Sequence, residues 1–217
     1  MITTYDNCPL GIYQDIERIS RDKGREDIDK QVAILALLSG KTERDILNLP
    51  LPDYHVLAVQ SEFLGRPAPK ASRPAAKYRL GDFTLVPVLD LRKLTTAQYI
   101  DFQTFAPQGD DKLVELLSVL LVPEGMTYGD GYDTALVQQA IREELPVSAA
   151  ISLSAFFFKS WLTLTEDTLA SLETEVKKAR KIKDATKRAE LLTRIEKTKQ
   201  DLRRRSKLVG AGLRRWT

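Results

Sequence analysis

Apolar and polar positions alternate with the period of an α-helix along most of this chain. In the first 64 residues, four short runs of this kind are separated by charged or proline-containing turns, and they cover residues 9–20, 26–38, 42–49 and 53–64. Because Gly40 follows the second run and Thr42 begins the third, we expect Gly40 to end one helix and Thr42 to cap the next. The pattern predicts a compact helical unit over residues 1–64.

A proline-rich segment and a pair of short strands follow this unit. Residues 65–76, GRPAPKASRPAA, hold three prolines and no large apolar side chain, which is typical of an extended linker. Residues 78–80 and 83–88 flank a Gly-Asp pair and predict a β-hairpin. Proline cannot donate to a central ladder, so Pro87 is expected to place the second strand at a sheet edge or to end it early.

The next region is helical again, and its last helix is almost entirely apolar. Three helices are expected, capped by Thr95 or Thr96, by Asp110 or Asp111, and by Asp133, and ending at Phe105, Leu121 and Leu145. Pro146 then opens the stretch PVSAAISLSAFFFKSW, which carries a single charge. A helix that is apolar nearly all round is normally buried, so we predict a core helix with Phe157 or Phe158 inside. Its uncharged run, residues 147–158, is shorter than the roughly 20 residues of a membrane span.

From residue 165 the apolar positions narrow to a heptad-like seam among charged residues. One seam comprises Leu169, Leu172, Val176 and Ala179, and a second comprises Leu191, Ile195, Leu202 and Val209. The phase shift between them predicts a break at residues 184–187 and a helical hairpin, with one continuous helix as the alternative. The predicted fold is therefore mainly α: a helical bundle with a small β-hairpin and long C-terminal helices. Its four parts are residues 1–64, 65–76, 77–164 and 165–217.

Charge divides the chain more sharply than its net value of +3 suggests. Residues 1–162 hold 17 Lys and Arg against 22 Asp and Glu, whereas residues 163–217 hold 16 against 8. The candidate partner-binding residues lie at the basic end: Arg203, Arg204, Arg205, Lys207, Arg214, Arg215 and Trp216. Such a cluster suits nucleic-acid phosphates, an acidic protein surface or simply a solvated helix face. Trp216 favours docking on protein, because its large apolar ring gains most from burial.

Candidate chemistry is sparse, and no catalytic, cofactor or metal site is predicted. Gly40-Lys41-Thr42 lacks the glycine five residues earlier that a phosphate-binding loop requires, because position 35 is leucine. The only histidine, His55, lies in an ordinary helical pattern, and with the single Cys8 it provides no zinc-type ligand set. A lone cysteine also excludes an internal disulfide and fits a reducing compartment.

Paired carboxylates add no convincing site. Asp130 and Asp133, within YGDGYD, lack the alternating ligands and the later glutamate of a calcium loop, so a turn and a helix cap are expected. The pairs Asp110-Asp111 and Glu143-Glu144 are neighbours in sequence, and neighbouring residues on a helix point in different directions. We therefore expect a protein without enzymatic activity. The first residues show no basic and apolar signal-peptide pattern, so no leader is expected.

Three segments between residues 90 and 158 resemble proteins of tailed bacteriophages: LRKLTTAQYIDF, LLSVLLVPEGMTY and ELPVSAAISLSAFFF. The resemblance is to small virion and tail-morphogenesis proteins, including tail-assembly chaperones, crAss-like phages among them. It implies a structural protein of the head–tail region, the tail or the virion interior, made in the host cytoplasm. The alternatives are a tail-assembly chaperone and a small nucleic-acid-binding protein.

The same resemblance implies the kind of partner. We expect other phage structural proteins, a homo-oligomer or a large assembly, and non-specific contact with packaged DNA, with neither a membrane nor a cofactor. The basic C-terminal region lies outside the resemblance, so its role rests on its charge alone.

Overall fold

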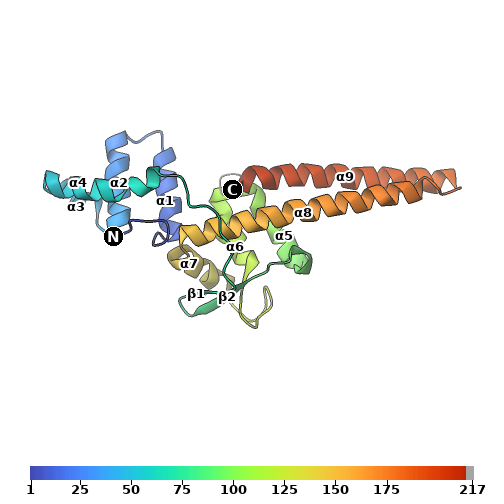
Figure 1. The fold of residues 1–217 in the computed structure, drawn as a ribbon, viewed down its shortest axis with the longest axis horizontal. Coiled ribbons are helices and arrows are strands. Elements are labelled where there is room, and N and C mark those ends of the chain that lie inside the picture. Colours follow the sequence, from blue (N-terminus) through green and yellow to red (C-terminus); the bar gives the residue numbers. More distant parts are fainter. Residues whose placement is uncertain (214–217) are drawn as a thin grey trace.

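The fold is mainly α, as the helical periodicity predicts. Its shape is elongated (Figure 1). This computed structural model describes residues 1–213, without the side chains of residues 110, 205 and 208–213. A small helical unit lies at one end, a compact body in the middle, and a long two-helix hairpin extends from the body at the other end. The order of the described elements is α1–α4, β1, β2, α5, α6, β3 and α7–α9, with three short 3-10 helices, η1–η3.

The N-terminal unit contains four short helices: α1 (Leu10–Arg21), α2 (Asp27–Ser39), α3 (Glu43–Leu47) and α4 (Leu51–Gln60), followed by η1 (Glu62–Gly65). The expected end of α2 and the expected start of α3 are both confirmed. Gly40 ends α2 at a left-handed φ of 67°, and the Thr42 side chain accepts a hydrogen bond from the Asp45 amide in a capping box. Leu10 and Gly11 are buried where α1 meets the body, and Ala33 is buried on α2. The unit's own core consists of two small clusters, one of Val32, Leu35, Ala36 and Ile46, the other of Ile16, Leu38 and Phe63.

The body contains a three-stranded antiparallel sheet in the order β1 (Tyr78–Leu80), β2 (Phe83–Pro87) and β3 (Leu121–Pro123). The predicted hairpin is present, but the third strand was not foreseen. Its residues continue the leucine-rich run of the preceding helix, and nothing in three apolar residues distinguishes a strand from a last helical turn. Of the two alternatives expected for Pro87, the edge position is wrong, whereas the early end of the strand is confirmed. Strand β2 is central, and Pro87 is its last residue, opposite Leu121.

Three helices complete the body around this sheet: α5 (Thr96–Phe105), α6 (Leu113–Leu120) and α7 (Thr134–Glu144), with η2 (Leu91–Lys93) and η3 (Ala106–Lys112) between strands and helices. Thr95 and Asp133 cap α5 and α7 as predicted. Neither Asp110 nor Asp111 caps α6, which begins after Lys112. Gly109, with φ 60° and ψ −131°, interrupts the helical path there and places both aspartates in η3.

The predicted core helix forms the first half of α8 (Val147–Ala179), which runs without a break for 33 residues. Phe157 and Trp161 are 1% and 2% exposed in the main core, whereas Phe158 is half-buried at its edge. The rings of Phe102 and Trp161 lie 5.2 Å apart, joining α5 to α8. This single large cluster also takes in the leucines of α6 and the inner residues of the strands. The boundary expected between residues 164 and 165 lies inside this continuous helix.

A close crossing joins the N-terminal unit to the body. The amide of Leu10 donates to the carbonyl of Leu145 at 2.8 Å, and the amide of Val147 donates to the carbonyl of Cys8 at 2.9 Å. A Cβ atom at Gly11 would lie 2.7 Å from the carbonyl oxygen of Arg142. Helix α1 can therefore approach α7 this closely only with glycine at this position.

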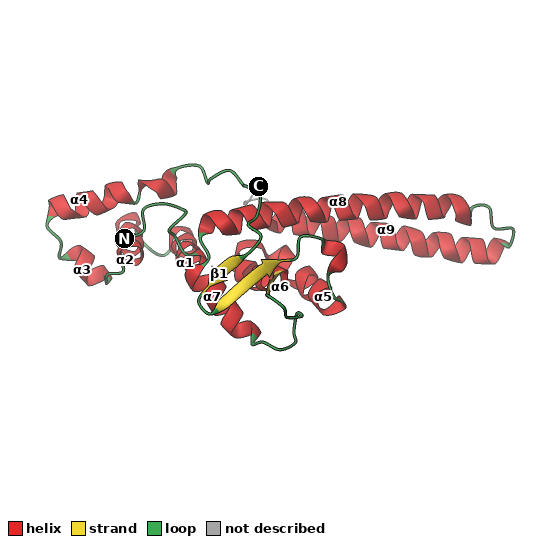
Figure 2. Ribbon diagram, turned by 60° about the horizontal axis from the view of Figure 1, so that its bottom comes forward, coloured by secondary structure: helices red, strands yellow, loops and turns green. Residues whose placement is uncertain are grey.

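The last part of the chain is a helical hairpin, and the continuous-helix alternative is excluded. Helix α9 (Ala185–Leu213) runs back along α8 and its far part packs against η3 in the body (Figure 2). Leu169, Leu172 and Val176 are half-buried along the predicted seam, which ends at buried Ala179. On α9, Ile195 is buried and Leu202 half-buried, but Leu191 is exposed and its neighbour Leu192 points inward instead.

The proline-rich segment is extended but is fastened to the body. Both the amide and the hydroxyl of Ser72 lie 3.1 Å from the hydroxyl of Ser152 on α8. Pro74 is buried, and the hydroxyl of Tyr5 donates to the carbonyl of Arg66 at 3.3 Å. These contacts hold the segment at both of its ends.

Candidate functional site

The most concentrated charge in the described structure lies at the far end of the hairpin, where α8 turns into α9 (Figure 1). We define the hairpin tip as residues 177–188, KKARKIKDATKR, which hold seven cations and one acid, Asp184. The cations are Lys177, Lys178, Arg180, Lys181, Lys183, Lys187 and Arg188. All but the half-buried Arg188 are exposed, and within the described residues none of them pairs with a carboxylate. The tip therefore presents a net charge of about +6 to solvent.

The backbone of the tip is held by local hydrogen bonds. Asp184 caps α9, since its carboxylate accepts from the amides of Thr186 and Lys187, both at 3.0 Å. The guanidinium of Arg188 reaches back to the carbonyl of Ile182 at 3.0 Å. Asp184 and Arg188 therefore stabilise the turn. The side chains of the other six cations make no hydrogen bond within the described structure.

The basic cluster that the sequence suggested lies elsewhere on α9. Arg203, Arg204 and Lys207 are exposed on its second half, close to the body, and the side chain of Arg205 is not described. Arg214, Arg215 and Trp216 lie outside the described residues. Their predicted partner-binding role stays a prediction, and 15 residues of helix, 189–203, separate Arg204 from the tip.

The second unusual surface is apolar and lies on the N-terminal unit. Helix α4 has no buried residue, although most of its side chains are apolar. We define the α4 face as Leu51, Val56 and Val59, which are 67%, 56% and 63% exposed. Leu47, at the end of α3, adds a fourth apolar side chain that is 69% exposed. Tyr54 and Leu57 point the other way and pack on the cluster beneath.

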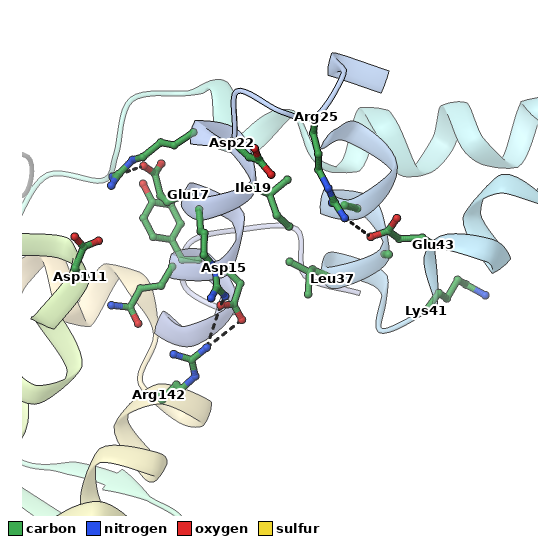
Figure 3. A pocket seen from close by; sticks show the side chains of 16 residues that line it. Asp15, Glu17, Ile19, Asp22, Arg25, Leu37, Lys41, Glu43, Asp111 and Arg142 are labelled. Atoms are coloured by element: carbon green, nitrogen blue, oxygen red, sulfur yellow. Dashed lines mark hydrogen bonds and ion pairs between the residues drawn. The ribbon is translucent and has the colours of Figure 1, made fainter. Parts of the chain in front are cut away.

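A charged groove of about 900 Å³ lies between α1, α2 and α7 (Figure 3). Its walls are linked by ion pairs, including Arg142–Asp15 at 3.0 Å and Arg25–Glu43 at 3.4 Å. Figure 3 shows the first pair crossing from α7 to α1, and the second bridging toward α3. These carboxylates are already matched by cations of the chain. The Arg142–Asp15 pair joins the N-terminal unit to the body, whereas the Arg25–Glu43 pair lies within the N-terminal unit. We therefore interpret the groove as a structural contact and not as a binding site.

The residues weighed for chemistry are dispersed rather than brought together. His55 lies exposed on α4, and Cys8 is fully buried in the main core, where burial raises the pKa of its thiol to about 12. A thiol held protonated in this way is a poor nucleophile. Among the described residues, no group of three or more His, Cys, Asp or Glu side chains is arranged to hold a metal ion.

The glycine-containing motifs have the structural roles that were expected. Gly40 and Thr42 end and begin helices, so Gly40-Lys41-Thr42 forms no phosphate loop. In YGDGYD, both glycines adopt positive φ and Asp133 caps α7 through the amide of Ala135 at 2.8 Å. Tyr128, at the start of this loop, donates to Asp101 at 2.8 Å; burial first, and then this carboxylate, raise the pKa of its hydroxyl.

By length and composition alone, α8 contains a stretch apolar enough to cross a membrane, the one such helix among the described residues. Within that stretch, 44% of the residues are buried inside the molecule. Its buried residues, Phe157 and Trp161 among them, belong to the main core, so packing accounts for their apolar character. The absence of a membrane partner stays a prediction.

A search against protein-family models finds no match, and searches of curated proteins and of solved structures find no similar protein. The two surfaces described above are therefore the observations from which a function is inferred.

Sequence reasoning passed over both surfaces. The tip holds seven basic residues within twelve, and the sequence predicts them only as part of a basic C-terminal arm. Their place at the outermost point of the hairpin follows from the structure. The α4 face was hidden in a helical pattern that resembled an ordinary half-buried helix. The sequence does not show that no other element of the chain packs over the α4 face.

Proposed function

We propose that this protein is a non-enzymatic structural component of a tailed-phage particle and acts by packing against neighbouring protein subunits. The observation that carries the proposal is the α4 face, whose three apolar side chains are each more than half exposed. The resemblance of residues 90–158 to tailed-phage proteins supplies the biological setting.

The geometry of α4 supports a binding surface rather than scattered apolar residues. At about 100° per residue, Leu51, Val59 and Val56 fall within an arc of roughly 140°. Tyr54 and Leu57, which pack inward, lie on the opposite side of the helix. Burying a Leu or Val side chain contributes about 1.5–3 kcal/mol, so a partner covering this face would gain substantially. Exposed apolar groups of this kind mark protein interaction sites.

The same face would also suit a tail-assembly chaperone, which binds an apolar partner during assembly and then leaves. The two functions differ in where the protein is found after maturation. Mass spectrometry of purified particles from the phage that encodes the chain should detect it at a fixed ratio to the other structural proteins. Its presence in infected cells together with its loss from purified particles would favour the chaperone.

A variant tests whether the α4 face is the contact. Phage carrying Leu51→Ser, Val56→Ser and Val59→Ser should yield particles that lack the protein, because the apolar contact is removed. A matched control carries Ile100→Ser and Leu136→Ser, which are 57% and 52% exposed on α5 and α7. The control should incorporate normally. Equal incorporation of both variants would contradict the role given to α4.

A further inference from the structure

The charge of the hairpin tip exceeds what the stability of the hairpin requires. Cations near a helix C-terminus are favourable because they face the negative end of the helix dipole, which accounts for Lys177 and Lys178 in the last turn of α8. The opposite holds at a helix N-terminus. Lys187 lies in the first turn of α9 and Lys183 just before its cap, where a cation is unfavourable. Folding alone therefore does not explain these two lysines.

The hairpin also holds the tip away from the rest of the molecule. The groove between η2 and α8 ends at Asp167 on α8. At about 1.5 Å per residue, the 13 residues from there to Arg180 carry the tip roughly 20 Å further out. Lys199 on α9 bridges the two helices along the way, at 3.9 Å from Glu173 on α8, and its side chain is 12% exposed. It also lies 3.8 Å from Glu196 on its own helix. The cations are thus presented on a braced support.

We propose that the hairpin tip binds the phosphate backbone of a nucleic acid without reading its sequence. The tip carries about one net positive charge for every two residues, and a phosphate backbone is the anionic surface with comparable charge density. Two adjacent helices, each about 10–12 Å across, are too wide for the major groove, which is about 12 Å wide. The contacts are therefore made to phosphates, and specificity for base sequence is not expected.

The composition of the tip favours nucleic acid over an acidic protein surface. Protein interfaces usually have an apolar or aromatic centre, but the largest apolar residue in the tip, Ile182, is half-buried in the turn. Interfaces with nucleic acid are more polar and more positive, as this surface is. The inference concerns the isolated protein and is independent of the role proposed for the α4 face.

Fluorescence anisotropy with a random-sequence 30-bp DNA duplex tests the proposal on the full chain. The tip variant replaces Lys177, Lys178, Lys181, Lys183 and Lys187 with glutamine. The matched control replaces with glutamine five exposed cations that lie outside both the tip and the predicted basic cluster, Arg79, Lys93, Lys159, Arg194 and Lys197, and so changes the net charge by the same amount. Each lost phosphate contact should reduce the slope of log affinity against log salt by about 0.9.

The tip variant should bind at least about 100-fold more weakly than wild type at 0.1 M salt, because three lost contacts suffice for such a change. The control should stay within about threefold of wild type. A tip variant that binds as well as wild type, or a control that loses as much affinity, would overturn the proposal. In the second case the affinity would follow the net charge of the protein and not the position of the tip.

A second variant separates binding from folding. Lys187→Glu places an acid three residues after the Asp184 cap, where it favours α9 through the helix dipole and a capping box. Thermal stability should therefore be unchanged or slightly raised while affinity for the duplex falls. Unchanged affinity contradicts the proposal. A polyglutamate peptide that binds wild type as tightly as the duplex at equal salt would also overturn it, in favour of an acidic protein partner.

Discussion

The two halves of α8 belong to one unbroken helix but have opposite surroundings. The first half, through Trp161, is buried among α5, α6, α7 and the strands. In the outer half, Ala179 is the one fully buried residue beyond Thr165. The body is therefore stabilised by broad apolar packing, whereas the hairpin rests on a narrow seam, helix propensity and a few charged contacts. The comparison teaches that the inner half is constrained by packing and that the outer half is left free to carry charge.

The largest expected difference between the two halves comes from removing one apolar side chain from each. Phe157→Ala is expected to lower the free energy of unfolding by about 3–5 kcal/mol, since Phe157 fills the main core. Leu172→Ala, in the half-buried seam, should cost about 1 kcal/mol or less, because much of its surface is already solvated. Urea unfolding followed by circular dichroism measures both. Equal losses would mean that the hairpin is as tightly packed as the body.

The contact between the N-terminal unit and the body provides the next largest effect. Gly11→Ala should destabilise the protein by about 1–3 kcal/mol, because the added Cβ overlaps the carbonyl oxygen of Arg142 and forces α1 away from α7. Gly65→Ala is the matched control, since a Cβ there meets nothing within 4 Å. Thermal unfolding of both variants tests the crossing. A Gly11→Ala protein as stable as wild type would show that the two parts are not tightly joined.

The smallest effect concerns thiol chemistry. At pH 8, Cys8 should react with a disulfide reagent about 1,000-fold more slowly than a cysteine introduced by Ser171→Cys on the exposed hairpin, because its raised pKa suppresses the thiolate. The pKa of the Cys8 thiol is about 12 in the folded protein and near 8.5 in the unfolded chain, so the folded state holds the proton more tightly. The contribution of this thiol to the free energy of unfolding is therefore complete below pH 8.5 and declines as the pH rises toward 12. Rapid labelling of both cysteines would contradict the burial of Cys8.

Local chemistry made much of the fold predictable from the sequence. Thr42, Thr95 and Asp133 each marked a helix start, Gly40 marked an end, and the apolar run around Phe157 identified the core helix. These features depend on residues close together in the chain, and periodicity detects them well.

The predictions were wrong where contacts between residues far apart in the sequence determine the local structure. Strand β3 forms because β2 offers it a partner, and Leu121 alone does not reveal this. Leu192 rather than Leu191 faces α8, a choice set by the hairpin register and not by residue type. The two candidate surfaces could not be predicted from the sequence, because each exists only where no other part of the chain packs over it. The α4 face and the tip cations emerge only when the rest of the chain is in place.

Hydrogen exchange along α8, measured with and without the 30-bp duplex, tests the central contrast between a packed body and an exposed binding hairpin most directly. In the free protein, amides of residues 150–161 should exchange near the rate set by global unfolding, and those of residues 170–179 should exchange orders of magnitude faster through local opening. Adding duplex should slow exchange at residues 177–188 and leave α4 unchanged. Uniform protection along α8, or duplex protection confined to another segment, would contradict the account.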